Sequence, residues 1–333
     1  MSKMPKYPLR NSLMIAWKPE CFRSASTAML FGSKLCLIGS HKRHGKISLL
    51  FNYIDRMIAT LRLLVRERPA SVICLNQPPM LPMVCWLYSR FTGAAVIMDF
   101  HSGAISKPQW KIFLPFLRHV ARKSPFTICH NRFDGKVVAS WHARVLHILS
   151  IPRDELGGVS YAPRGGRPLY LFSCSFAEDE PVDVAIEAMK SCPEFDFVIS
   201  GNYRKRQLDP AAQPPNIRLA GFMDFSDYLA TLAQSSAVIS LSTRPHIMQM
   251  AIEEALSAGI PVVTNTSPTL SEVLGEGASF SDLDASSLAA AFRDVAECHA
   301  LRAQGITKAK QAVYAQISNE ISSVKQIHRE IFA

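Results

Sequence analysis

The sequence predicts an α/β protein built from two doubly wound domains, each with a parallel sheet covered by helices on both faces. The chain has 333 residues, 48% of them hydrophobic, which is enough for two separate cores. Short β-rich runs alternate with longer helical runs, a pattern typical of parallel sheets. A Gly/Pro-rich stretch, LGGVSYAPRGGRP over 156–168, interrupts the alternation and indicates a linker. We therefore place one domain over 1–160 and the other over 161–333.

Eleven strands are expected, six in the first domain and five in the second. The first six are SLMIAW, KLCLIGS, SVICLN, AAVIMDF, FTICHN and ARVLHIL, and the other five are LYLFSCS, FDFVISG, IRLAGF, AVISLS and PVVTN. Helical segments lie between them, and the last helix of the chain is able to cross back to the first domain. Two Rossmann-like halves should therefore face each other across a cleft. Ligands of such sheets bind at the carboxyl ends of the strands, so we expect them in that cleft.

The two domains differ strongly in charge. Residues 1–160 hold 23 Lys and Arg against 7 Asp and Glu, or +16, and residues 161–333 hold 14 against 20, or −6, which sum to the net +10. The cations of the first domain lie on amphipathic, helix-like segments such as YIDRMIATLRLLVRER and QWKIFLPFLRHVARKS. This fits peripheral contact with an anionic membrane surface, or an ordinary solvated helix packed on a sheet. No motif indicates nucleic-acid binding.

The cysteines and the apolar runs indicate in which cellular compartment the protein lies. Eight cysteines are spread along the chain without a C-x-x-C pair, which favours reduced thiols in a cytosolic protein over disulfides or a zinc site. No run of about eighteen apolar residues appears, so we expect neither a signal peptide nor a membrane span. The protein should be soluble or peripheral.

A polar segment with a helix behind it follows the strand AVISLS. The loop TRPH leads into a helix expected over IMQMAIEEALSAG, which ends at Gly259. A helix N-terminus suits a phosphate, and Arg244 and His246 lie beside it. Glu254, about two turns beyond His246, is placed to accept hydrogen bonds from a ribose. The alternative is a solvent-facing glutamate pair behind an ordinary turn.

The segment EEALSAGIPVVTNTSPTLSEVL resembles the donor-binding region of GT-B fold glycosyltransferases of family 4, where an E-x7-E pattern precedes A-x-G-x-P-V-V. The resemblance implies that Glu254 holds the ribose of a nucleotide sugar and that Thr266 belongs to the donor site. The first glutamate of the pattern corresponds to His246. The family's Arg and Lys for the diphosphate correspond to Ser175 and Glu180 here.

Other cations must then meet the diphosphate charge. The candidates are Arg244 and, in the segment SGNYRKR, Arg204 and Lys205. Gly201 opens that segment and allows a close approach of backbone to phosphate. No convincing metal-binding D-x-D loop is present, so we expect protein groups to stabilise the leaving diphosphate, with no metal and no cofactor.

Three further motifs narrow the resemblance. SFAEDEPVDVAIEA, CLNQPPMLP and MDFHSGAI are similar, in the same order, to segments of the eukaryotic β-1,4-mannosyltransferase family that extends dolichol-linked chitobiose. Together with the donor segment they cover roughly residues 70–285. The chain is shorter than that family and lacks its N-terminal membrane anchor, so it resembles a bacterial-type relative. The resemblance implies a lipid-linked acceptor.

The motif MDFHSGAI supplies the candidate catalytic residues. It places Asp99 and His101 where a strand opens into the cleft, and inverting transfer needs one base there for the acceptor hydroxyl. We favour Asp99 as the base and His101 as an orienting group. The alternatives are that Asp99 only caps a nearby loop and that His101 is only a packed, hydrogen-bonded imidazole. Asn76, in the turn after SVICLN, and Glu20 are assigned to the acceptor. Glu20 and His130 are the next candidates for the base.

These observations predict a hexosyltransferase of the inverting type. It would transfer a sugar from a nucleotide-diphosphate sugar, with GDP-mannose as one candidate, to a lipid-linked or growing polysaccharide acceptor at the cytoplasmic membrane face. Two alternatives stay open. A non-hydrolysing nucleotide-sugar epimerase would share the fold, and a non-catalytic sugar-binding or scaffold subunit would explain the absent Arg/Lys pair.

Overall fold

The chain folds into two compact units. The structure, a computed structural model, describes residues 7–39, 46–148, 156, 159, 161, 162 and 166–332. One unit comprises Met1–Ile151 with Ala315–Ala333, and the other comprises Pro152–Tyr314. The division thus falls at 151/152, before the predicted 160/161. Helix α12 (His299–Phe332) begins in the second unit and ends in the first.

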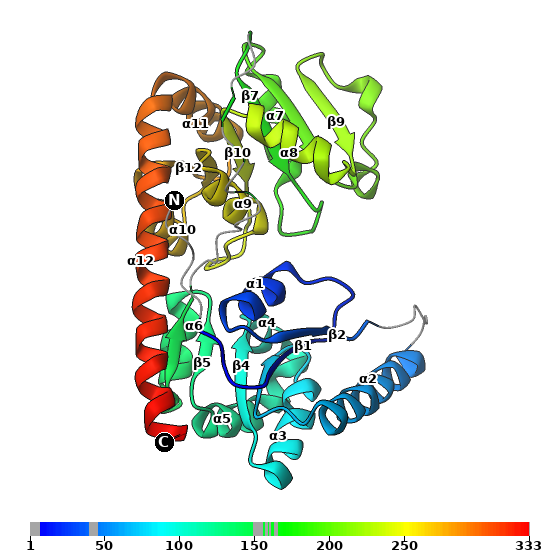
Figure 1. The fold of residues 1–333 in the computed structure, drawn as a ribbon. Coiled ribbons are helices and arrows are strands. Elements are labelled where there is room, and N and C mark those ends of the chain that lie inside the picture. Colours follow the sequence, from blue (N-terminus) through cyan, green and yellow to red (C-terminus); the bar gives the residue numbers. More distant parts are fainter. Residues whose placement is uncertain are drawn as a thin grey trace. The chain divides into compact units, whose positions relative to one another are not determined.

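The first unit contains a six-stranded parallel sheet (Figure 1). Its strands are β1 (Ser12–Ala16), β2 (Lys34–Leu37), β3 (Ser71–Leu75), β4 (Ala95–Phe100), β5 (Thr127–Cys129) and β6 (Val145–His147), in the order β2-β1-β3-β4-β5-β6. The intervening helices are α1 (Phe22–Leu30), α2 (Lys46–Glu67), α3 (Met80–Thr92), α4 (Gly103–Ser106), α5 (Leu114–Lys123) and α6 (Arg132–Ala139), with a 3-10 helix at Pro108–Phe113.

The second unit contains another six-stranded parallel sheet. Its strands are β7 (Leu169–Ser173), β8 (Asp196–Ser200), β9 (Ile217–Gly221), β10 (Ala237–Ser240), β11 (Val262–Asn265) and β12 (Ala278–Ser281), in the order β12-β11-β10-β7-β8-β9. The helices are α7 (Val182–Lys190), α8 (Phe225–Gln234), α9 (Met250–Ala258), α10 (Pro268–Leu274) and α11 (Ala285–Glu297), with short 3-10 turns at Tyr203–Arg206, Pro210–Ala212 and Gly275–Gly277. All eleven predicted strands are confirmed. The sequence analysis missed β12, a short ASFS run with no continuous apolar stretch.

The strand order fixes where each sheet can bind a ligand. In the first sheet β2 is added on one side of β1, and β3 and all later strands are added on the other side. In the second sheet β8 and β9 lie on one side of β7, and β10, β11 and β12 lie on the other. The strand order therefore switches sides between β1 and β3 and between β7 and β10. At such a switch point the loops leaving the two strands diverge and leave a crevice at their carboxyl ends. These edges are therefore the first places to look for a site.

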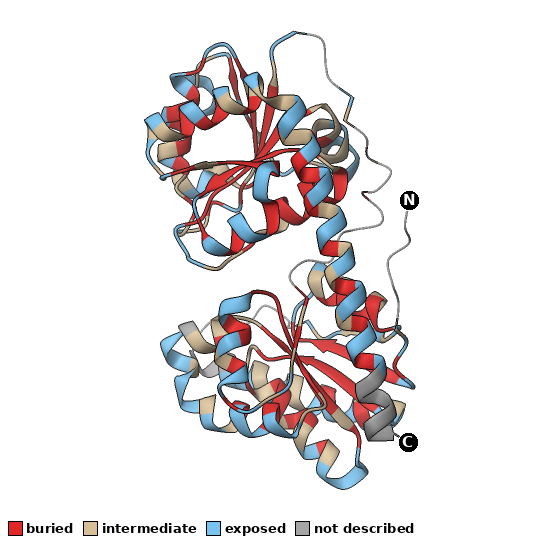
Figure 2. Cartoon of the chain, turned by 90° about the vertical axis from the view of Figure 1, so that its left-hand side faces the viewer, coloured by how far each residue is buried: buried red, intermediate tan, exposed pale blue. Residues whose placement is uncertain are grey.

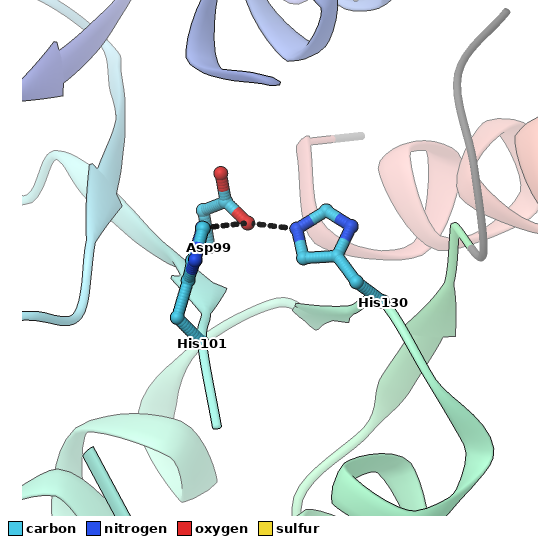
Figure 3. Close-up of side chains that lie close together, drawn as sticks. All are labelled: Asp99, His101 and His130. Atoms are coloured by element: carbon cyan, nitrogen blue, oxygen red, sulfur yellow. Dashed lines mark hydrogen bonds and ion pairs between the residues drawn. The ribbon is translucent and has the colours of Figure 1, made fainter. Parts of the chain in front are cut away.

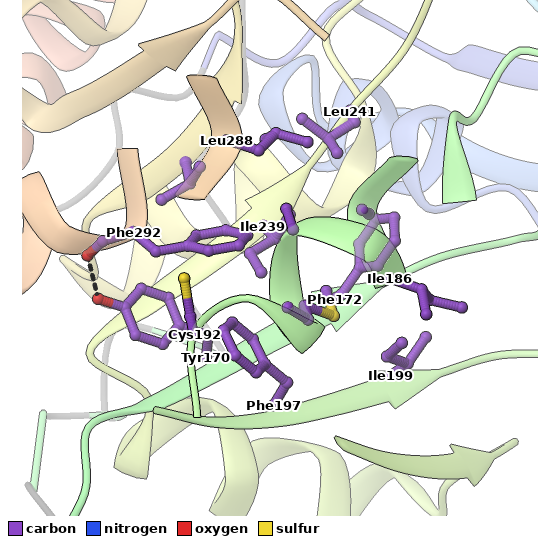
Figure 4. Packing of buried hydrophobic residues seen from close by; sticks show 14 of the residues in the cluster. Tyr170, Phe172, Ile186, Cys192, Phe197, Ile199, Ile239, Leu241, Leu288 and Phe292 are labelled. Atoms are coloured by element: carbon purple, nitrogen blue, oxygen red, sulfur yellow. Dashed lines mark hydrogen bonds between the residues drawn. The ribbon is translucent and has the colours of Figure 1, made fainter. Parts of the chain in front are cut away.

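Each sheet forms the buried layer of its unit, with exposed residues on the outer sides of the helices (Figure 2). In the second unit aromatic rings pack between β7, β8 and α11 (Figure 4). The hydroxyl of Tyr170 donates a hydrogen bond of 2.6 Å to the carbonyl of Phe292, so this deeply buried phenol is satisfied. A rigid core of this kind holds the strand ends in place.

The eight cysteines are all free thiols, and five of them are buried. Within the described ranges, no helix is both long and apolar enough to cross a bilayer.

Candidate active site

Polar side chains gather at the carboxyl ends of three neighbouring strands of the first sheet. Asn76 follows β3, Asp99 is the penultimate residue of β4 with His101 just beyond it, and His130 follows β5. Parallel strands place these ends at one edge of the sheet, so residues far apart in the sequence meet there. The predicted catalytic pair is thus joined by Asn76 and by His130.

Asp99 and His130 form a buried pair (Figure 3). Nε2 of His130 is hydrogen-bonded to Oδ1 of Asp99, and Nδ1 lies 2.9 Å from the carbonyl oxygen of Ile148. Both ring nitrogens face acceptors, and the ring can donate to both only when it is doubly protonated. Burial alone would raise the pKa of Asp99, but the charge of His130 and the contacts with both histidines outweigh burial and hold that pKa well below its usual range.

His101 is the more accessible member of the cluster. Its backbone N–H donates to Oδ1 of Asn76 at 2.9 Å, and its Nε2 lies 3.8 Å from Oδ1 of Asp99. The side chain is 22% exposed, whereas that of Asp99 is fully buried. Burial, together with the charges of His130 and Arg23, lowers the pKa of His101 to about 4, although Asp99 opposes the shift. His101 is therefore a neutral imidazole at neutral pH.

Three polar atoms of this cluster have no hydrogen-bond partner among the described residues although they are buried. They are Nδ2 of Asn76, Oδ2 of Asp99 and Nε2 of His101. Buried polar groups are almost always paired, so such atoms mark a place where a ligand or water supplies the partner. One is a donor, one is an acceptor, and the imidazole nitrogen can be either. The cluster can thus bind a hydroxyl group.

A second network fixes the loops that carry the two histidines. The hydroxyl of Ser102 donates to Oδ2 of Asp134 at 2.5 Å, and Nδ2 of Asn131 donates to the same oxygen at 2.8 Å. Asp134 lies in the first turn of α6, and Asn131 caps that helix by accepting from the Asp134 N–H. Sequence reasoning missed this network, although an Asn three residues before an Asp is the spacing of a helix cap.

Asp99, His101 and His130 are the one group of residues in the described ranges that could hold a metal ion, since their ligand atoms lie within 4.8 Å of one another. The bond from Nδ1 of His130 to a carbonyl is of the kind that orients metal-binding histidines. However, Nε2 of His130 is already hydrogen-bonded to Oδ1 of Asp99, and an ion held by both atoms would have to replace this bond. That no metal takes part stays a prediction.

The lowered pKa of His101 makes the fold sensitive to acid. Between the ordinary value of 6.5 and about 4 the unfolded chain binds a proton that folded His101 does not. The free energy of unfolding should therefore fall as pH drops from 6.5 to 4. Urea unfolding of the wild type and of His101→Gln across this range should show the steeper loss in the wild type, and parallel curves would contradict this origin of acid sensitivity.

The second unit has a pocket of about 570 Å³ at its switch point. Ser173 and Cys174 at the end of β7, Ser200 at the end of β8, and Gln249 and Met250 at the start of α9 contribute to its wall. The N-terminus of α9 is thus at the pocket, as an anion site requires.

Glu180 is buried and organises the loop after β7. Its carboxylate accepts hydrogen bonds from the Ser175 hydroxyl at 2.9 Å, from the Ala177 N–H at 2.9 Å and from Nε2 of Gln249 at 3.1 Å. Gln249, the residue before α9, also bonds to the hydroxyl of Ser240 at the end of β10. Glu180 therefore ties the two loops of the switch point together. Both Ser175 and Glu180 line the pocket, but the carboxylate already bonds to protein donors.

Gly201 lines the same pocket and is required by the backbone. Its φ is +112°, and a Cβ at this position would lie 1.8 Å from the carbonyl oxygen of Cys174. The loops after β7 and β8 therefore approach each other more closely than any side chain allows. The sequence predicted that the Gly201 backbone approaches a phosphate closely. In the structure it closely approaches the backbone of Cys174.

Helix α9 begins at Met250, three residues later than predicted. His246 has a left-handed φ of +63° and lies in the loop before the helix, where its Nδ1 is 3.5 Å from the Thr269 hydroxyl. Glu254 is half-buried, and its Oε2 accepts from the hydroxyl of Tyr228, which lines the pocket. Glu253 is 4% exposed, so the two glutamates do not form a solvent-facing pair.

The predicted cations are engaged beside the pocket and do not line it. Arg244 pairs with Asp179 at 3.2 Å, Nζ of Lys205 donates to the Ser175 carbonyl at 2.7 Å, and the Arg204 guanidinium lies 6.0 Å from the centre of the Tyr203 ring.

The two other predicted site residues lie elsewhere. The Thr266 hydroxyl lies 3.4 Å from the Ser281 carbonyl, at the β11–β12 side of the sheet, and Glu20 is exposed after β1. Thr266 is not among the residues that line the pocket of its unit, and within the described residues no hydrogen bond or ion pair joins Glu20 to the Asp99 cluster.

Residues 167–297, which include every strand of the second sheet, match the family model for glycosyl transferases group 1. The match thus covers most of the second unit. The residues that line the pocket at the start of α9 all lie within the matched segment. No curated protein sequence matches the chain.

Solved structures resemble the whole chain. Sucrose-phosphate synthase from Thermosynechococcus elongatus has a TM-score of 0.71 at 13% identity over 98% of this chain and 99% of that one. Anabaena HepE in complex with UDP and glucose has a TM-score of 0.68 at 12% identity over 96% and 99%. UDP-GlcNAc 2-epimerase from Neisseria meningitidis, bound to UDP-GlcNAc, has a TM-score of 0.62 at 12% identity over 96% and 99%. The chain thus has a GT-B fold.

Proposed function

We propose that the protein is a glycosyltransferase that transfers a sugar from a nucleotide-diphosphate sugar to a lipid-linked or growing polysaccharide acceptor. The observation that carries this proposal is the pocket at the start of α9, inside the segment that matches the group 1 family, with Glu254 one contact away through Tyr228. UDP or UDP-glucose is bound in the HepE structures, which supports a nucleotide sugar as the ligand. GDP-mannose is a candidate donor on the resemblance of the sequence motifs.

The donor would be held by backbone rather than by cations. Gln249, Met250 and Ala251 at the start of α9 line the pocket, and the helix dipole favours a diphosphate there. Glu254 contacts Tyr228 of the pocket wall, and a carboxylate at this place would accept a hydrogen bond from a ribose hydroxyl. Arg244 and Lys205 would add charge once they exchange their present partners.

The first unit would activate the acceptor. His101 is neutral at neutral pH and partly exposed, so it can take the proton of a hydroxyl, while buried Asp99 holds the ring and stabilises the charge that develops. This reverses our sequence preference for Asp99 as the base, because a fully buried carboxylate bonded to His130 is harder to reach. A single base at the acceptor hydroxyl fits transfer with inversion. Asn76 would place the acceptor through its free Nδ2.

The location follows from charge and is a proposal too. The first 160 residues carry +16, which suits the anionic cytoplasmic face of a membrane, where a lipid-linked acceptor would be found. The protein would be peripheral at that face.

Calorimetry and thermal shift with GDP, UDP, dTDP and CMP sugars test the donor proposal, since a ligand of the native state raises the melting point. With the donor so found, Glu254→Ala should weaken binding by about tenfold or more, because a charge-assisted hydrogen bond contributes about 1.5–3 kcal/mol. Glu187→Ala is the matched control: it removes an exposed glutamate of α7 that does not line the pocket, so it should bind donor as the wild type does. Equal affinity of Glu254→Ala and wild type would exclude the ribose contact.

A second candidate is a nucleotide-sugar epimerase, since one is among the structural neighbours. Incubation with the donor alone separates the two functions. An epimerase yields an isomer without acceptor, whereas the proposed transferase yields none.

A further inference from the structure

Helix α2 exposes an apolar stripe to solvent. Its exposed large hydrophobic residues are Leu50, Phe51, Ile54, Ile58, Leu61 and Val65. From Phe51 onward they follow one another at intervals of three and four residues, which places them on one face of the helix. Leu50 is 62% exposed and Val65 57% exposed, so these side chains are not covered by their own unit.

A neighbouring face of α2 packs against α3 and the core of its own unit. Thr60 and Leu64 are fully buried, and the Thr60 hydroxyl accepts a hydrogen bond of 2.8 Å from Nε1 of Trp17. An ordinary surface helix would be polar on its outer side. In α2 the exposed stripe lies about 100° around the helix from the buried residues, while Asp55 and Arg62 occupy the side opposite them. The apolar surface is therefore wider than the core of the unit covers, and the exposed part needs a separate explanation.

Cations border the stripe. Arg62 and Arg68 are exposed on and just beyond α2. The end of α3 lies beside the end of α2, since Val65 and Thr92 line one pocket, and it adds exposed Arg90 next to Phe91, which is 84% exposed. Apolar side chains with arginines beside them are the composition of helices that lie in a membrane interface.

A second copy of the chain fits this surface less well. The regular stripe covers two heptads, Phe51 to Val65, whereas coiled coils are recognised over three to four. Two copies would also bring the arginines of both stripes together. An anionic lipid surface offers both an apolar phase and the opposite charge.

We propose that α2 is the membrane-docking element of the protein, lying flat on an anionic bilayer with the stripe among the acyl chains and the arginines at the headgroups. This proposal rests on the proposed function, because a lipid-linked acceptor is the reason for the protein to bind a membrane. It assigns membrane binding to one face of α2, whereas net charge alone would place it anywhere on the first unit.

Sedimentation of the full chain with phosphatidylcholine vesicles, with and without phosphatidylglycerol, tests the proposal. The double variant Ile58→Ser/Leu61→Ser should lower partitioning onto anionic vesicles by about tenfold or more, since each side chain loses its apolar burial. Leu301→Ser is the matched control, because Leu301 is 46% exposed on α12 and lies outside the stripe. It should partition as the wild type does.

Each other result has a definite meaning. Equal partitioning of the double variant and the wild type would overturn the docking role of α2. A wild type that is dimeric and does not bind vesicles, with a double variant that is monomeric, would also overturn it. The stripe would then be the interface with a second copy of the chain. Donor affinity by calorimetry is read separately: its absence in the wild type would remove the proposed function and leave the vesicle result to decide the docking.

Discussion

Replacing His101 by Gln is expected to lower turnover by about 10²–10⁴-fold, the usual contribution of a general base. The ring is neutral, partly exposed and held between Asn76 and Asp99, so its loss removes the proton acceptor and little of the fold. Donor affinity should stay nearly unchanged, because the donor pocket is built from residues of the second unit. Single-turnover rates and calorimetry on the same preparation give both quantities.

Variants of the neighbouring residues separate the roles within the cluster. Asp99→Asn should lower turnover and also the melting point, since it leaves His130 without its anionic partner in a buried site. His119→Gln, an exposed histidine on α5, serves as the control and should leave turnover unchanged. If His101→Gln raised the donor's dissociation constant along with slowing the reaction, His101 would orient the donor sugar. Near-normal turnover of both His101→Gln and Asp99→Asn would remove the base from this cluster.

Replacing Gly201 by Ala is expected to cost about 3 kcal/mol or more of unfolding free energy. The new methyl group would lie 1.8 Å from the Cys174 carbonyl oxygen, and the φ of +112° is disfavoured for any L side chain. The strands on either side are buried, so the backbone has little room to relax. Urea unfolding of the variant measures this loss.

The matched control for Gly201 is Gly259 in the same unit. It also has a positive φ, +71°, but a Cβ there meets nothing within 4 Å. Gly259→Ala should therefore lower the free energy of unfolding by only about 1 kcal/mol, the cost of a left-handed conformation for alanine. If the two variants were equally stable, the close approach of the β7 and β8 loops would not be what requires glycine at position 201.

Much of the architecture could be predicted from the sequence, because parallel strands buried on both faces contain continuous apolar runs such as VICL in β3 and LYLF in β7. The two-domain α/β fold and the position of Asp99 at a strand end came from these runs. Strand β12 lacks such a run, and its burial comes from its neighbours β11 and α11. The start of α9 was misplaced because the loop residues before it are apolar enough to continue the helical pattern.

The residues of the candidate site divide in the same way. By itself the sequence determined the fold class and singled out Asp99, His101, Asn76 and Glu254, because each stands next to a strand or helix signal within a few residues. Only the tertiary structure decided their partners, since strand order brings His130 to Asp99 across 31 residues and Gln249 to Glu180 across 69. It likewise decided which carboxylate is buried and which imidazole stays neutral, because desolvation depends on neighbours that no local pattern encodes.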